Sequence, residues 1–195
     1  EKALNGLPGD LSSESLAKSY MKKFSSTDEA IHSLIKWQTA KSSTSGFVTG
    51  LGGIVTLPVA VPVNIASVLY VQMRMIAAIA YMRGYDLKDD QVQTFVFICL
   101  TGQAASDILK QSGITVGTKL TVQLIKKVPG ATLTKINQKV AFRLVTKFGE
   151  KGVINLGKLV PIVGGVIGAS VDGVGTKIIG NQAKKLFVEF DSPVI

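Results

Sequence analysis

The residues that could carry acid–base or nucleophilic chemistry are few and scattered along the sequence. His32 is the only histidine, and a lone helical histidine is more often a surface or structural residue than a general base. A serine three residues before a lysine, as in lysine-activated nucleophiles, occurs at Ser15/Lys18, Ser19/Lys22 and Ser33/Lys36. These pairs recur in Ser- and Lys-rich helices without the companion motifs of that chemistry, so chance explains them better. We therefore predict that the protein is not an enzyme.

The sequence also gives no support for a metal site, a cofactor site or a phosphate-binding loop. Cys99 is the only cysteine, it lies in an apolar run, and no pair of His or Cys residues has metal-ligand spacing. The segment from Gly173 to Lys177 resembles a phosphate loop, but it lacks the Walker spacing, and we expect it to lie inside a helix. We predict neither a metal nor a cofactor.

A row of cations is the strongest candidate for binding. The row takes every fourth residue of one segment and consists of Lys135, Lys139, Arg143, Lys147 and Lys151. The same segment repeats apolar residues at the same interval: Ile136, Val140, Leu144 and Phe148. On a helix this pattern makes a basic ridge beside an apolar stripe, which is typical of binding to an anionic lipid surface. An ordinary solvated helix face remains an equal alternative.

The charge balance supports a polyanionic partner. Residues 108–158 hold 10 Lys and Arg against Glu150 alone, whereas residues 1–90 hold 9 basic and 8 acidic residues. Nucleic acid is not the partner we expect, because the sequence shows no helix-turn-helix pattern and no aromatic residues interleaved with the cations.

Two further sets of residues lie among the apolar segments. Small residues four apart, at Gly46/Gly50, Gly164/Gly168 and Ala169/Gly173, allow helices to approach closely, either in a membrane or inside a soluble bundle. The polar residues expected to be buried among the apolar helices are Asn64, Gln72, Arg74, Asp107 and Asp172. We expect Arg74 to pair with an acid such as Asp172. The pair would be either a satisfied core contact or the polar end of a lipid pocket.

The elements that position these residues are expected to be helices, because apolar residues recur at intervals of three and four. A strand is an alternative only around residues 160–166. The expected helices cover residues 13–24, 27–43, a short glycine-rich stretch, 63–83, 90–100, 104–111, 115–127, 132–148 and a glycine-rich C-terminal segment. Pro58 and Pro62 favour a kinked connector over residues 57–62, between the glycine-rich stretch and the helix of residues 63–83. Gly84 is expected to end the long helix in a left-handed cap.

The composition predicts one all-α domain. Of 195 residues, 46% are hydrophobic and only 18% charged, and residues 42–73 contain no charged residue. We predict a single-domain multi-helix bundle around this central apolar segment, which glycines and prolines interrupt. Residues 1–10 are expected to form a flexible arm and residues 11–190 the domain. Because the chain begins at Glu1 rather than at a methionine, we expect preceding residues to have been removed.

The order of these signals resembles the EcsC family of bacterial proteins over residues 33–188. The residues that carry the resemblance are Gly50 and Gly53, Leu57-Pro58-Val59, Pro62-Val63-Asn64, Arg83-Gly84-Tyr85-Asp86 and the run from Val160 to Gly168. The family often has an acid after the second proline, where this chain has Asn64. The resemblance implies association with membranes and transport, since the family is named for a gene beside an ATP-binding cassette exporter. It implies no catalytic residues.

These patterns favour a non-catalytic peripheral membrane or lipid-binding protein at the inner face of the bacterial membrane, in the cytoplasm. The basic helix would contact anionic lipid, and the apolar centre would hold an acyl chain. The first alternative is an interaction or regulatory partner of a membrane transporter. The second is a protein whose residues 46–83 insert into the bilayer as a glycine-zipper hairpin.

Overall fold

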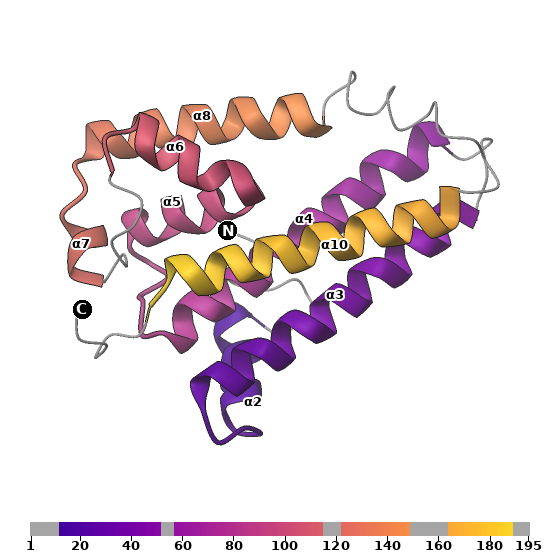
Figure 1. Ribbon diagram of the computed structural model, residues 1–195, viewed down its shortest axis with the longest axis horizontal. Coiled ribbons are helices and arrows are strands. Elements are labelled where there is room, and N and C mark those ends of the chain that lie inside the picture. Colours follow the sequence, from indigo (N-terminus) through magenta and orange to yellow (C-terminus); the bar gives the residue numbers. More distant parts are fainter. Residues whose placement is uncertain (1–11, 52–56, 115–121, 149–163, 189–195) are drawn as a thin grey trace.

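The computed structural model describes residues 12–51, 57–114, 122–148 and 164–188. Within these ranges, side chains are described for residues 12–43, 68–114, 123–146 and 173–188. The elements are α2 (Ser13–Met21), α3 (Thr27–Leu51), α4 (Leu57–Met82), α5 (Asp90–Cys99), the 3₁₀ helix η2 (Gly102–Ala104), α6 (Ala105–Gln111), α7 (Val122–Lys126), α8 (Gly130–Phe148) and α10 (Gly164–Leu186) (Figure 1). The predicted all-α class is confirmed.

Two predicted breaks are absent from the described helices. The helix expected to stop near residue 43 continues as α3 to Leu51, through Gly46 and Gly50. The predicted connector at residues 57–62 is wrong, because these residues form the first turns of α4. Pro58 lies in the first turn, where a helix does not use the backbone N–H that proline lacks. Pro62, one turn later, removes one hydrogen bond without ending the helix.

Other helix ends follow the local chemistry expected of them. The side-chain oxygen of Ser26 accepts a hydrogen bond from the Glu29 amide at 3.2 Å, the N-terminal cap of α3. After α4, Gly84 has φ 85°, and the amides of Gly84 and Tyr85 donate to the carbonyls of Tyr81 and Ala80. This is the left-handed cap predicted for Gly84, and a residue with a Cβ would be strained there.

The helices form two groups: an arm of α3, α4 and α10, and a cover of α5, η2, α6 and α8. α3, α4 and α10 run side by side, with α2 against the lower part of α4, and their far ends project beyond the other helices (Figure 1). α5 and η2 pack on this arm, and α8 lies across α5 and α6 on the side away from α3 (Figure 1). α5 is therefore a middle layer, and its residues Phe95, Ile98 and Cys99 are fully buried.

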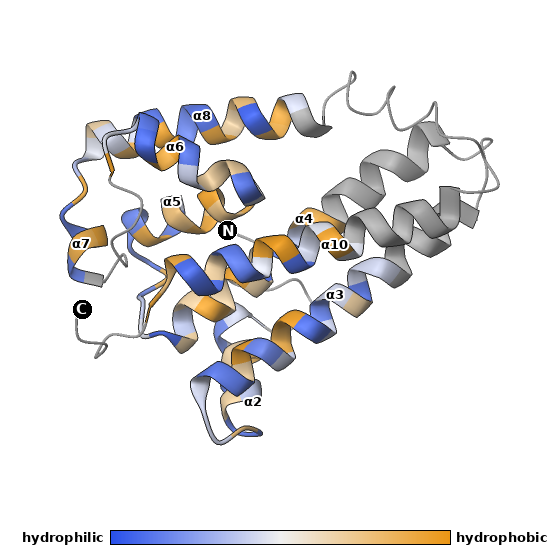
Figure 2. Ribbon diagram, viewed as in Figure 1, coloured by the Kyte–Doolittle hydropathy of each residue, from blue (hydrophilic) through white to orange (hydrophobic). Residues whose placement is uncertain are grey.

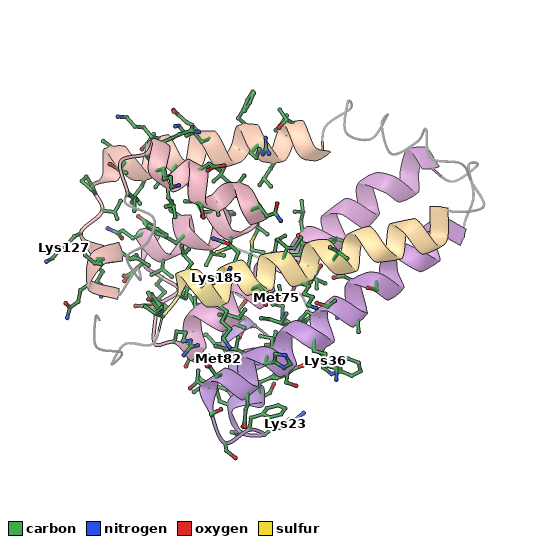
Figure 3. All side chains as sticks on the ribbon, viewed as in Figure 1. Lys23, Lys36, Met75, Met82, Lys127 and Lys185 are labelled. Carbon is green, nitrogen blue, oxygen red and sulfur yellow. The ribbon has the colours of Figure 1, made fainter. Side chains whose placement is uncertain are left out.

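The core lies where the arm meets this cover. Every residue of α4 from Met75 to Ala80 is fully buried, so this part of the helix has no face toward solvent. Figure 2 shows apolar residues on the inner sides of the described helices and polar residues along the outer sides. Figure 3 shows Met75 and Met82 among the packed side chains, whereas Lys127 and Lys23 extend from the edges.

One ionic cluster joins the three helices of the arm at its lower end. Asp28 of α3 accepts from the buried guanidinium of Arg83, just after α4, and the ammonium of Lys184 on α10 lies 3.5 Å from the same carboxyl oxygen. Burial raises the pKa of Asp28, but the two cations outweigh that effect and hold its pKa below the ordinary value. The cluster fixes the end of the arm opposite its projecting end.

Candidate functional site

The helix that carries the basic ridge has a well-defined inner face. On α8, Ile136 and Val140 are buried and Leu144 packs partly against the same core. The side-chain amide of Asn137 also donates to the hydroxyl of Thr94 on α5 at 3.4 Å. The apolar stripe predicted from the sequence is thus the packing face of α8, which leaves the other faces for solvent or a partner.

The predicted cations of the ridge do not share one environment. Lys135 and Arg143 are exposed, and neither forms an ion pair with a residue in the described part of the chain. The ammonium of half-buried Lys139 instead donates to the side-chain oxygen of Gln111 on α6 at 2.9 Å and to its carbonyl at 3.4 Å. Lys139 therefore also links α8 to α6. The Lys147 side chain and all of Lys151 lie outside the described residues.

Two apolar side chains on the outer face of α8 escaped the sequence analysis. Phe142 is 72% exposed and Val145 is 67% exposed, although both are large hydrophobic residues. At about 100° per residue, Phe142 lies opposite the buried stripe and about 20° from Lys135, and Val145 lies about 60° from Phe142, whereas Arg143 lies at the edge nearer the stripe, about 100° from Phe142. The sequence signal was available, since neither Phe142 nor Val145 fits the four-residue apolar repeat. We define the α8 outer face as the exposed residues Lys135, Phe142, Arg143 and Val145, with Arg143 at its edge.

The electrostatics of this face favour an anion. The described residues 130–146 of α8 contain no acidic residue, and Lys110 on α6, Lys126 at the end of α7 and the following Lys127 are also exposed. Lys126 lies 3.5 Å from the carboxyl of Asp89, so part of its charge is balanced within the protein. Within the described chain, no carboxylate lies at ion-pair distance from Lys135 or Arg143 to balance their charge in the same way.

A second group of polar residues lies inside the arm. The buried side-chain amide of Gln72 on α4 donates to the hydroxyl of Thr176 on α10 at 3.1 Å. Ser42 of α3 and Arg74 are buried in the same part of the bundle. Among described residues, the Gln72 side-chain oxygen and the Ser42 hydroxyl have no hydrogen-bond partner, which makes this polar layer costly. Sequence analysis predicted the burial of Gln72 and Arg74 but missed Thr176. Its prediction that Asp107 is buried is wrong, because this residue is exposed on α6.

The remaining predicted residues of the arm are only partly visible. Asn64 lies in α4 and Asp172 in α10, but their side chains, and so the predicted Arg74–Asp172 pair, lie outside the described part. The predicted packing glycines at positions 46, 50, 164 and 168 lie in α3 and α10, and their contacts are likewise outside it.

The described close contacts involve Gly173, which belongs to the predicted Ala169/Gly173 pair, and Gly180, which the sequence analysis did not single out. A Cβ on Gly180 would lie 2.8 Å from Cγ1 of Ile35, and one on Gly173 would overlap the hydroxyl of Ser43. The backbone of α10 therefore packs directly against side chains of α3. Gly173 also lies inside α10, as expected from the rejection of a phosphate loop there.

The residues first considered for catalysis do not converge. His32 is exposed on α3, and burial raises the pKa of the Cys99 thiol well above its ordinary value, which keeps it protonated. Lys18 lies 3.9 Å from Glu14 and over the ring of Tyr81, and the hydroxyl of Ser19 donates to a backbone carbonyl. The described residues contain no group of three His, Cys, Asp or Glu side chains suited to a metal ion.

Comparison with known proteins identifies one family. Residues 6–188 match the EcsC protein family. Searches of curated proteins and of solved structures give no match. Among the described helices, none combines the length and the apolar character needed to cross a membrane.

Proposed function

The chain belongs to the EcsC protein family over residues 6–188, and from that premise we propose that it is a non-catalytic peripheral protein of the bacterial membrane. Its α8 outer face binds the anionic lipid surface on the cytoplasmic side. The observation that carries this proposal is the exposure of Phe142 and Val145 beside Lys135 and Arg143. A solvated helix face needs no aromatic residue pointing outward, whereas a helix lying in the lipid headgroups needs both cations and apolar anchors.

The energies match reversible binding. Each cation near an anionic membrane contributes about 1 kcal/mol, so Lys135 and Arg143 supply about 2 kcal/mol. Burying Phe142 in the headgroup–acyl boundary adds about 1.5–3 kcal/mol. The sum of about 3.5–5 kcal/mol corresponds to roughly low-millimolar to submillimolar affinity, typical of a protein that exchanges between membrane and solution.

The proposal places lipid on the outside of the described core. Residues from Met75 to Ala80 are fully buried by protein side chains, so they leave no surface for an acyl chain. The predicted lipid pocket around Asn64, Arg74 and Asp172 therefore stays a separate hypothesis. It would need the polar layer of the arm to open.

Vesicle flotation tests the proposal. The wild-type protein should float with vesicles that contain anionic lipid, and the floating fraction should fall as salt is added, because salt screens exposed charges. The double variant Lys135→Glu and Arg143→Glu should lose this binding. A matched control, Lys22→Glu and Lys23→Glu, makes the same change in net charge at the exposed turn after α2 and should still float.

The competing function, a regulatory partner of a membrane transporter, predicts a different result. Docking on a transporter should survive charge reversal on α8 and should require the transporter rather than anionic lipid. Equal losses in the two double variants, or flotation that ignores both salt and anionic lipid, would count against the α8 outer face.

A further inference from the structure

Contacts inside the arm show how its three helices run relative to one another. Ile35 of α3 and Met75 of α4 both lie against Gly180 of α10, and farther along the arm Ser43 lies against Gly173. α3 therefore continues past Ser43 in the direction in which α4 and α10 begin. Three stretches project together beyond the polar layer: residues 44–51, 57–71 and 164–171 (Figure 1). We call these stretches the arm tip.

The composition of the arm tip is unusual, although Val68, near the base of its α4 stretch, is buried within the protein. None of its three stretches contains a charged residue, and the first charges along the helices are Lys41, Arg74 and Asp172 at its base. At 1.5 Å per residue, the stretches extend about 12 Å on α3 and α10 and about 22 Å on α4. Half of a hydrocarbon core is about 15 Å thick, so the arm tip has the depth of one leaflet.

Just below the arm tip, exposed side chains have the composition of a membrane interface. Trp37 and Val174 are 68% and 57% exposed, and Lys41 and Lys177 are exposed beside them along α3 and α10. Lys41 lies about 3 Å and Trp37 about 9 Å below Ser43 along the helix axis. Tryptophan prefers the headgroup level, and lysine extends its ammonium group to the phosphates. We call these four residues the collar.

We propose that the arm tip enters one leaflet of a lipid bilayer, with the collar at the level of the headgroups. The inference deepens the proposed function, since it keeps the bilayer as partner, but it assigns apolar insertion to a surface that does not include α8. The lack of charge, the match in depth and the collar all point to lipid rather than to a folded protein. The polar residues of the three stretches are all uncharged: Thr44, Ser45, Thr49, Asn64, Ser67, Tyr70 and Ser170.

The protein carries its own probe for the test, because Trp37 is the only tryptophan. Its fluorescence should move to shorter wavelength when the protein binds vesicles, since the exposed ring leaves water. Lipids brominated near the headgroup end of the acyl chain should quench Trp37 more strongly than lipids brominated near the chain terminus. Protein that floats with vesicles while Trp37 shows neither change would overturn the insertion.

A matched pair of exposed valines separates the two surfaces. Val174→Asp puts a charge in the collar and should remove the shift and the quenching of Trp37 while flotation on anionic vesicles persists. Val145→Asp instead puts a charge on the α8 outer face. At lipid concentrations at which this variant still binds, the shift and the quenching of Trp37 should be retained. Both residues are exposed, so both variants should keep the wild-type helix content and unfolding midpoint by circular dichroism.

The outcomes distinguish this inference from the function on which it rests. Salt-sensitive, anion-dependent flotation with an unquenched Trp37 would overturn insertion and leave the α8 proposal standing. Flotation on uncharged vesicles with a quenched Trp37 would overturn the α8 proposal and support insertion. Failure to float on any vesicle would overturn both.

Discussion

α10 and α8 both carry apolar residues at helical spacing, yet the two helices use them in opposite ways. α10 turns Gly173 and Gly180 toward α3, and the absence of side chains there makes room for Ser43 and Ile35 of α3. α8 instead fills its inner face with branched side chains and leaves Phe142 and Val145 in solvent. The contrast teaches that apolar content alone does not identify a binding face. What matters is whether the fold supplies a protein partner for each apolar residue.

The strongest test of this contrast is Gly180→Val. The added side chain must displace Ile35 and Met75, and overpacking of this kind typically costs about 1–3 kcal/mol. We expect a loss of free energy of unfolding at the upper end of that range, measured by urea denaturation followed by circular dichroism.

Its control lies on the same helix. A Cβ added at Gly175 would meet no heavy atom within 4 Å, so Gly175→Ala should keep or raise stability, by up to about 1 kcal/mol. Equal destabilisation by both variants would show that α10 is sensitive to any side chain rather than to close approach at Gly180.

The next effect in size concerns the exposed aromatic residue of α8. Phe142→Ala should weaken partition into anionic vesicles about 10-fold or more, because the membrane loses about 1.5–3 kcal/mol of apolar burial. The unfolding midpoint should not change, since the ring is 72% exposed. Phe24→Ala, at the exposed turn after α2, is the control and should leave partition unchanged. A fall in stability without a fall in partition would make Phe142 a packing residue.

The cations of α8 should differ among themselves. Lys135→Ala removes an exposed charge and should weaken vesicle partition about 5-fold, the equivalent of about 1 kcal/mol. Lys139→Ala should weaken partition less, because its ammonium group is bound to Gln111, and it should lower stability slightly. A vesicle titration of both variants makes the comparison. If the two variants lose affinity equally, the bond to Gln111 does not hold Lys139 away from lipid.

The smallest effect is expected in the ionic cluster of the arm. The folded state lowers the pKa of Asp28, so its carboxylate stabilises the protein above the ordinary pKa of 3.8, and that stability is lost as the pH falls through the lowered value. Because Asp28 is largely exposed, Asp28→Asn should cost less than about 1 kcal/mol at neutral pH. The difference between wild type and variant should vanish in acid. A difference that persists there would point to packing rather than charge.

The sequence predicted the local features of this fold well. The all-α class, the left-handed Gly84 and the inner stripe of α8 depend on residues within a few positions of one another. The same local rules failed at residues 57–62, where two prolines predicted a connector. The rule did not allow for Pro58 lying in the first turn, where a helix tolerates it.

The sequence could predict which residues of α8 are cations, but not which of them face solvent, for a physical reason. Periodicity identified the ridge of α8, but it assigned the same role to each cation. Whether Lys139 faces lipid or Gln111 depends on α6, which lies 28 residues earlier in the chain. The exposure of Phe142 and Trp37 likewise depends on which helices cover them.

By itself, then, the sequence determined helix formation, the concentration of positive charge after residue 108 and the charge-free stretch of residues 42–73. Only the tertiary structure decided that α10 meets α3 through Gly173 and Gly180, that Gln72 meets Thr176, and that three charge-free helix ends project together. The reason is that helix propensity and charge are properties of neighbouring residues. Burial and exposure are set by contacts between helices far apart in the chain.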